Sequence, residues 1–239
     1  AHADEVAIDP QGRVHTFCSA VKDKWTVMSC TLSAGLSLRW LRDTCCQEEI
    51  QLAKERGVDP YVIMCELAEK STIGANRLLF LPYLMGERSP INDTNARGTF
   101  IGMTMDTTRA DMVQAVLEGV AFAIRDSVEV ARSLGIPIIS SKICGGGAKS
   151  ALWKRILANV LNIPLECPES EQGPGMDGAM LAMVACGAYE GVKEVVDRFV
   201  KVASVVEPEP QLVAKYEKRY QQFKQIYPAC KNLFAALKD

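Results

Sequence analysis

Histidine is scarce in this chain of 239 residues, which contains only two, His2 and His15. A Ser-His-Asp hydrolase needs a histidine beside its nucleophile, and no GxSxG segment lies near His15, so that class is disfavoured. The chain also lacks an excess of positive charge. Its formal net charge is −2, so it does not offer the basic surface that nucleic-acid binding requires. No apolar run approaches the ~20 residues that a membrane-spanning helix needs. The sequence therefore predicts a globular domain without a nucleic-acid or membrane partner.

Cysteines in metal or disulfide spacing are also lacking, although the chain has nine cysteines. The count is odd, and Cys45 and Cys46 are adjacent instead of forming a CxxC pair. Most of the other cysteines stand singly in apolar stretches. We therefore expect reduced, mostly structural thiols, no metal site, and a cytoplasmic protein.

The first thirty residues have the alternation and turn chemistry of β-hairpins. Three strands are expected, at residues 6–8, 14–18 and 25–29. Asp9 follows the first of these strands, as does the Asp of the DxGT loop that binds phosphate in actin-like kinases. Pro10 and Gln11 separate Asp9 from Gly12 and no Thr follows, so we expect an ordinary turn.

Beyond Ser33 the pattern alternates helices with short strands. The longest helix is predicted from the apolar steps between Val113 and Leu134, with Thr108 and Asp111 as a capping box and Gly135 at its end. Other helices are expected after Ser33 and at 62–68, 153–161, 178–187, 192–200 and 211–237, and strands at 77–82, 138–144 and 164–167, with an irregular stretch at 83–105. Strand, glycine turn, helix, strand and helix in succession predict an α/β domain.

Three consecutive glycines begin the turn Gly145–Ser150, between a predicted strand and a predicted helix. Glycines at this place let a backbone approach a ligand, and a helix N-terminus offers free amides. A P-loop would need glycines at Ile143 and Ala148, so that motif fails. A dinucleotide-binding GxGxxG would need Gly or Ala at Ser150, although Glu166 falls near the place of a ribose-binding acid. A dinucleotide site and a purely structural turn both remain open on the turn alone.

Three segments, in order, resemble blocks of the FGGY family of carbohydrate kinases. They are Pro82–Pro90 (PYLMGERSP) with Asp93 and Ala96–Gly98 (ARG); Gly98–Met103 (GTFIGM) with Asp111-Met112 and Ala115–Glu118 (AVLE); and Gly145–Ser150 (GGGAKS) with Trp153. The glycine segment alone is weakly specific, but the three in this order and spacing are specific. The resemblance spans about residues 14 to 200.

The resemblance implies an actin-like ATPase (ribonuclease H-like) domain at residues 1–200, with N-terminal β-hairpins, followed by a helical C-terminal tail at 201–239. It implies MgATP as the cofactor. Gly145, Gly146, Gly147 and Ala148 would pack against the adenosine or its α-phosphate, and Asp106, in the loop 104–110, would border the adenine.

The family's sugar-binding N-terminal domain, its phosphate loop and its catalytic Asp have no match in this chain. By resemblance we expect the nucleotide-binding half of an enzyme that phosphorylates a ketopentose, D-xylulose, with no catalytic residue in this half. We do not assign Asp9, Asp93 or Asp177 to that role. Another sugar of the family, such as ribulose, gluconate or a polyol, and a non-catalytic nucleotide-binding module are the alternatives. By the same resemblance, one surface of this half would pack against the N-terminal domain. If that surface is exposed, we expect the chain to self-associate, for example as a homodimer.

Some residues of these three segments have two interpretations. Lys149 and Ser150 either contact the nucleotide or only solvate and cap the following helix. Glu87, Arg88, Asp93 and Arg97 either serve the site or brace the irregular stretch, for which a pair of Glu87 with Arg97 is the simplest arrangement.

Overall fold

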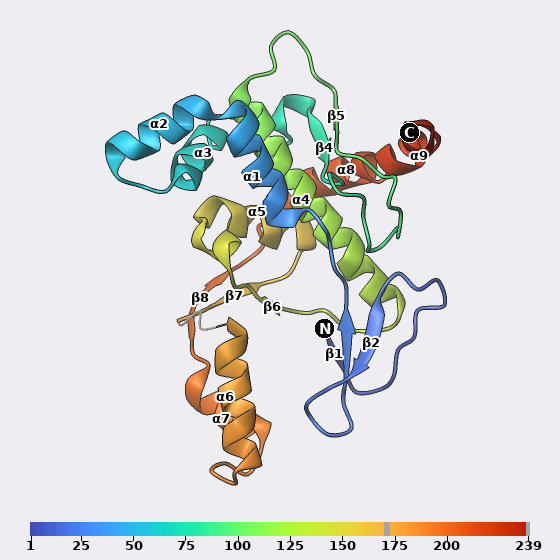
Figure 1. Cartoon of the computed structure of the whole chain (residues 1–239), viewed down its shortest axis with the longest axis vertical. Helices are drawn as coiled ribbons and strands as arrows, with labels where there is room; N and C mark the ends of the chain where they lie inside the picture. Colours follow the sequence, from blue (N-terminus) through green and yellow to red (C-terminus); the bar gives the residue numbers. More distant parts are fainter. Residues whose placement is uncertain (170–172, 238–239) are drawn as a thin grey trace.

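A 25-residue helix, α4 (Arg109–Ser133), runs through the middle of the molecule and organises the rest of it (Figure 1). The computed structural model describes residues 1–169 and 173–237. The predicted capping box is present, since Thr108 Oγ1 accepts from the Asp111 amide and Asp111 Oδ2 accepts from the Thr108 amide. The helix packs against α1, α3, α5, α8 and the strand β4. It is buried over most of its length, so its apolar positions extend well beyond one stripe.

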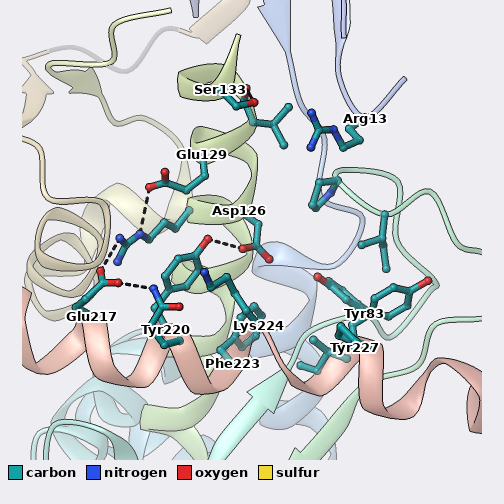
Figure 2. Close-up of a pocket in the computed structure, with 17 residues that line it drawn as sticks. Arg13, Tyr83, Asp126, Glu129, Ser133, Glu217, Tyr220, Phe223, Lys224 and Tyr227 are labelled. Atoms are coloured by element: carbon teal, nitrogen blue, oxygen red, sulfur yellow. Dashed lines mark hydrogen bonds and ion pairs between the residues drawn. The ribbon is translucent and has the colours of Figure 1, made fainter. Parts of the chain in front are cut away.

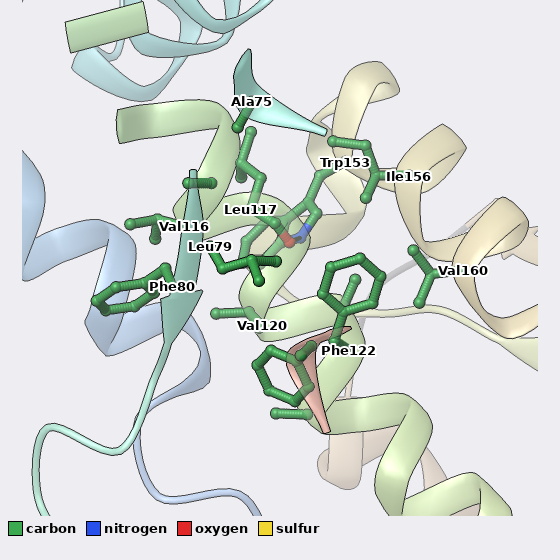
Figure 3. Close-up of a cluster of buried hydrophobic side chains, with 14 of the residues drawn as sticks. Ala75, Leu79, Phe80, Val116, Leu117, Val120, Phe122, Trp153, Ile156 and Val160 are labelled. Atoms are coloured by element: carbon green, nitrogen blue, oxygen red, sulfur yellow. Dashed lines mark hydrogen bonds between the residues drawn. The ribbon is translucent and has the colours of Figure 1, made fainter. Parts of the chain in front are cut away.

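The main core surrounds the N-terminal half of α4 (Figure 3). Leu117 and Val120 of α4 meet Phe80 of β4 (Leu79–Leu81) and Trp153 of α5 (Ala151–Leu161). The indole Nε1 of Trp153 donates to the Leu117 carbonyl over 3.2 Å, which satisfies its only polar atom inside the core. This contact fixes the start of α5, and therefore the preceding glycine turn, relative to α4.

The predicted α/β unit follows α4. Strand β6 (Ser141–Lys142) pairs parallel with β7 (Leu165–Pro168), and α5 connects them. Strand β8 (Val202–Val206) pairs antiparallel with β7 at the other edge. The sequence pattern did not predict β8: it lies just after the predicted boundary at residue 200 and joins the sheet of the preceding domain.

The N-terminal residues form an antiparallel sheet in the order β1-β3-β2: β1 (His2–Ala3), β3 (Trp25–Met28) and β2 (His15–Cys18). Two of the three predicted strands are confirmed. The strand predicted at 6–8 is wrong, because those residues are irregular and the first strand is β1. Asp9 forms the expected turn, in which its carboxylate accepts from Arg13 at 2.8 Å.

Helices α1 (Ala34–Cys45), α2 (Gln47–Arg56) and α3 (Pro60–Ala68) lie at one end of α4 (Figure 1). The pattern had not predicted α2, whose mean hydropathy is low and whose apolar face is small. A 3-10 turn, η1 (Ala75–Arg77), leads into β4, and β5 (Thr99–Ile101) pairs with β4 inside the stretch that was predicted to be irregular.

The C-terminal tail is helical after β8, as predicted. Helix α8 (Pro210–Phe223) packs on α5, α4 and β4, and α9 (Ile226–Ala236) follows it. Helices α6 (Gly173–Ala185) and α7 (Val192–Phe199) pack on each other and project away from the helices around α4 (Figure 1). All nine cysteines have free thiols, and Cys18, Cys144 and Cys186 are exposed, so these three are not part of the core.

Candidate functional site

The glycine turn begins where β6 ends. Gly145 has φ of 81°, in the left-handed region that favours glycine, and residues Gly146–Lys149 then form the 3-10 turn η2. Ser150 is the N-cap of α5, because its Oγ accepts from the Trp153 amide over 3.1 Å. Ser150 therefore caps the helix, and it also lines the cavity described below, so that a contact with the nucleotide stays a prediction. The turn thus presents the N-terminal end of an 11-residue helix, whose first amides lack intrahelical partners.

The three glycines have different surroundings. A Cβ atom added to Gly147 would lie 3.2 Å from the Trp153 ring, so this glycine is needed for packing. A Cβ atom added to Gly146 would meet no protein atom within 4 Å. Gly146 therefore borders open space, and its lack of a side chain is explained by neither packing nor a positive φ. Such a backbone surface can be approached closely by a ligand.

A cavity of about 540 Å³ lies in front of Gly146. Its walls come from the start of α1, one face of α3, the glycine turn and the first turn of α5, and its lining residues are Gly35, Leu38, Asp59, Tyr61, Val62, Cys65, Glu66, Glu69, Gly146, Gly147, Lys149, Ser150, Ala151, Leu152 and Trp153. The volume is within the ~300–1,000 Å³ usual for small-molecule sites, which are mostly apolar with a few polar groups.

Helix α3 is held against the turn by polar contacts. The Cys65 thiol and the Ser150 hydroxyl are 3.2 Å apart, and burial raises the pKa of that thiol, which keeps it protonated. Tyr61 is fixed from behind, because Arg42 donates to its hydroxyl over 3.1 Å and lies over its ring. These contacts preorganise the wall opposite Gly146.

The charges of the cavity are unevenly distributed. Asp59, Glu66 and Glu69 are all on the α3 side, and Asp59 is the N-cap of that helix. Glu66 is paired with Arg56 over 2.8 Å. Lys149 lies on the opposite side, in the turn, and is exposed. An anionic group is therefore favoured beside Lys149 and the start of α5, and disfavoured beside α3.

The structure brings together only some of the residues that the resemblance singled out. Gly146 and Gly147 line the cavity, while Gly145 and the buried Ala148 support the turn beside it. Asp106 lies elsewhere, in an exposed loop before α4 where its amide donates to Thr104 Oγ1 over 3.3 Å, and it does not line this cavity. The resemblance implied that the loop 104–110 borders the adenine. The sequence could not predict where this loop lies, because its position depends on the packing of α4.

The α1 and α3 walls were not predicted as part of a site. Gly35 lines the cavity, and a Cβ atom added there would also meet nothing within 4 Å. One feature of the sequence could have indicated the α1 wall: Gly35 stands in the first turn of a helix, where Ala would be more favourable. For α3 the Asp59-Pro60 start predicts a helix, but nothing local predicts which face it presents.

The irregular stretch is braced differently from the predicted pairing of Glu87 with Arg97. Glu87 is 2% exposed and accepts from the amides of Leu32 and Arg88, at 3.0 Å and 2.7 Å. Arg97 donates instead to the carbonyls of Thr94 and Ala96. The predicted pair is therefore wrong, because Glu87 Oε1 accepts from backbone amides instead, while Glu87 Oε2 has no partner among the described residues. Burial raises the pKa of Glu87.

Within residues 1–169 and 173–237, no group of three or more His, Cys, Asp or Glu side chains is arranged to hold a metal ion. In the same residues, no helix combines the length and the apolar character that crossing a membrane requires.

Comparisons with known proteins agree on one family. Residues 2–186 match the model of the C-terminal domain of the FGGY family of carbohydrate kinases. A xylulose kinase from Staphylococcus epidermidis is 37% identical over 224 residues, which cover 94% of this chain and 43% of that relative. The chain thus spans less than half the length of this relative.

Two solved structures are similar over nearly the whole chain. A xyloylose kinase from Brucella ovis has a TM-score of 0.83 and 34% identity, with 98% of this chain and 46% of that one covered. A gluconate kinase from Lactobacillus acidophilus has a TM-score of 0.87 and 26% identity, with 99% and 46% covered. The predicted fold class, an actin-like α/β domain, is confirmed by this similarity.

Proposed function

Because this chain belongs to the FGGY family of carbohydrate kinases, whose C-terminal domain it contains, we propose that it is the nucleotide-binding half of an ATP-dependent sugar kinase. The observation that supports this most strongly is the open backbone of Gly146 at the wall of the cavity between α3 and α5. A side chain there would occupy the cavity, and no packing contact accounts for its absence.

The cavity fits the adenosine end of ATP. Leu38, Val62 and Leu152 offer apolar surface to a base, and Gly146 permits close approach of the ribose. The carboxylates of α3 oppose phosphate, so we orient the phosphates toward Lys149 and the start of α5. ATP supplies the phosphoryl group that is transferred, and Mg²⁺ would accompany its phosphates.

The sugar site and the catalytic base are assigned to the part of the relatives that this chain does not cover. We propose D-xylulose as the substrate of the whole enzyme, since xylulose kinases are among the most similar relatives. Gluconate is the second candidate, because a gluconate kinase has a TM-score of 0.87 with this chain. A coupled assay of ADP release by the whole enzyme, with D-xylulose and gluconate compared at equal concentration, distinguishes the two.

The 239-residue chain alone is expected to fold and to phosphorylate neither sugar. The buried residues around α4 form one large hydrophobic cluster among the described residues, whereas the proposed base is not in this chain. The measurement is ADP release with MgATP and D-xylulose, together with a far-UV spectrum that shows the fold. Turnover above the background of a sugar-free control would place the base in this chain and contradict the assignment.

Replacement of Gly146 by Val is expected to abolish nucleotide binding. The proposed contacts of this chain are to the adenosine end of the nucleotide and the phosphates next to it, which ADP and ATP share. Both should therefore bind wild type alike, with a Kd on the order of 0.1 to 1 mM. The Val side chain would extend into the cavity, so no saturable binding should remain at millimolar ADP. The measurement is an NMR titration of wild type and variant with ADP, in which amides of the glycine turn and of α3 should shift.

Two further variants make the test specific. Gly35→Val places a side chain on the opposite wall and should also block ADP, whereas Gly178→Val, at an open glycine of α6 outside the cavity, should not. All three variants must retain the melting temperature of a folded domain. ADP binding that survives both cavity variants would mean that the glycine turn is only structural.

A further inference from the structure

A second cavity, of about 660 Å³, lies on another side of α4 (Figure 2). Its walls come from the C-terminal half of α4, the junction of α8 and α9, the stretch after β4, and Arg13 of the N-terminal segment. It shares no lining residue with the cavity of the glycine turn. The proposed nucleotide site therefore does not explain it.

Asp126 of α4 presents a free acceptor to this cavity. The Tyr220 hydroxyl donates to Asp126 Oδ1 over 2.6 Å, and Oδ2 has no hydrogen-bond partner in residues 1–169 and 173–237. Burial raises the pKa of Asp126 to about 6, while the Tyr220 hydrogen bond and Lys224 oppose the rise. The carboxylate is therefore mostly ionised at neutral pH and can accept from a ligand hydroxyl.

Tyr83 provides the second unsatisfied group. Its side chain is 1% exposed and lines the cavity, and its hydroxyl has no hydrogen-bond partner among the residues that the structure describes. Figure 2 shows Tyr83 and Asp126 at the same cavity, and the Asp126 charge adds to burial in raising the pKa of Tyr83. A hydroxyl at the wall of a cavity without a protein partner is available to donate to, or accept from, a ligand in that cavity.

The charged side chains around these two groups compensate one another. Arg125 pairs with Glu217 over 2.6 Å and with Glu129 over 3.4 Å, and Arg13 is paired with Asp9 over 2.8 Å. Lys224 lies over the Tyr220 ring, 5.0 Å from its centroid, where its charge opposes that of Asp126. The cavity thus offers donors and acceptors without a surplus of either charge.

We propose that this cavity binds a small neutral polyol. Adjacent hydroxyl groups of a polyol would donate to Asp126 Oδ2 and Tyr83 and accept from Lys224, while Ile91 and Pro90 would cover the carbon chain. An anion would meet Asp126 and Glu129, and a cation would meet Lys224 and Arg125, so both are opposed by like charge. The site goes beyond the proposed nucleotide and sugar sites of the kinase.

Xylitol, a neutral five-carbon polyol, is the probe. An NMR titration of the 239-residue chain should give saturable shifts confined to residues around Asp126, Tyr83 and Lys224, with a Kd on the order of 1 to 10 mM. Tyr83→Phe should weaken binding at least about fivefold. Its melting temperature should stay unchanged, because the hydroxyl that it removes has no partner in the described protein. Tyr189→Phe, outside the cavity, is the matched control and should bind like wild type.

The outcomes decide the proposal. Saturable xylitol binding that survives in Gly146→Val and is weakened in Tyr83→Phe supports it, whatever the fate of the nucleotide site. Three results would overturn it: no saturation up to about 100 mM, shifts confined to other regions, or equal binding by wild type and Tyr83→Phe. Tighter binding of choline or inorganic phosphate than of xylitol would also overturn it, since the cavity would then select a charge.

Discussion

Gly119→Ala is expected to destabilise the domain by about 2–3 kcal/mol, although alanine is the better helix former by about 1 kcal/mol. Gly119 lies in α4, and a Cβ atom there would be 2.2 Å from the Phe80 carbonyl oxygen of β4. The strand cannot easily move away, because Phe80 is paired with Phe100 of β5 and stacks on Trp40. Either α4 or β4 must therefore shift within a fully buried core.

Urea unfolding at pH 7 measures this effect. The matched control is Gly178→Ala in α6, where a Cβ atom meets nothing within 4 Å and a gain of about 0.5–1 kcal/mol is expected. The contrast removes helix propensity from the comparison, because both substitutions are the same. A Gly119→Ala variant within about 1 kcal/mol of wild type would show that α4 and β4 are not in the close contact described.

Glu118→Gln is expected to stabilise the protein above pH 7 by up to about 3 kcal/mol. Glu118 is 1% exposed, and burial raises the pKa of its carboxyl group to about 7. It accepts from the Gly74 amide and from Gln114 Nε2, both at 2.8 Å, while its Oε2 and Gln114 Oε1 have no partner within the described residues. A glutamine can accept from Gly74 and donate to Gln114 without a buried charge.

The sign follows from the two pKa values. Below the ordinary glutamate pKa of about 4.5 the Glu118 carboxyl is protonated in the folded and the unfolded state, so no buried charge reduces the stability. Between that value and about 7 the unfolded chain releases the proton while the folded protein keeps it, so stability falls as pH rises. Above about pH 7 the carboxylate is ionised in both states, and the folded protein bears the full cost of a buried charge. Glu118→Gln removes this cost.

The measurement is the free energy of unfolding of wild type and Glu118→Gln at several pH values between 4.5 and 8. The difference should be small at the acidic end and largest at pH 8. Glu5→Gln, at an exposed position, should show no such trend. A difference that is independent of pH would contradict the assignment of the raised pKa to Glu118.

Local patterns determined much of what could be predicted from the sequence. The apolar steps and the Thr108–Asp111 capping box predicted α4 closely, because a helix and its cap are built from residues three and four apart. Short segments were likewise enough to recognise the glycine turn between β6 and α5 and the resemblance to the FGGY family. Strand β8 and helix α2 were missed, since one is exposed at a sheet edge and the other is strongly polar.

Only the tertiary structure decided what these segments face. The sequence could not show that Gly146 borders a cavity while Gly147 packs on Trp153, or that Gly119 touches Phe80, some forty residues away in the chain. It placed Asp106 beside the adenine by resemblance, and it could not show that Tyr61 and Cys65 of α3 line the cavity beside the glycine turn. Cavities and buried charges arise from contacts between elements distant in sequence, and no periodicity or local spacing records which faces will meet.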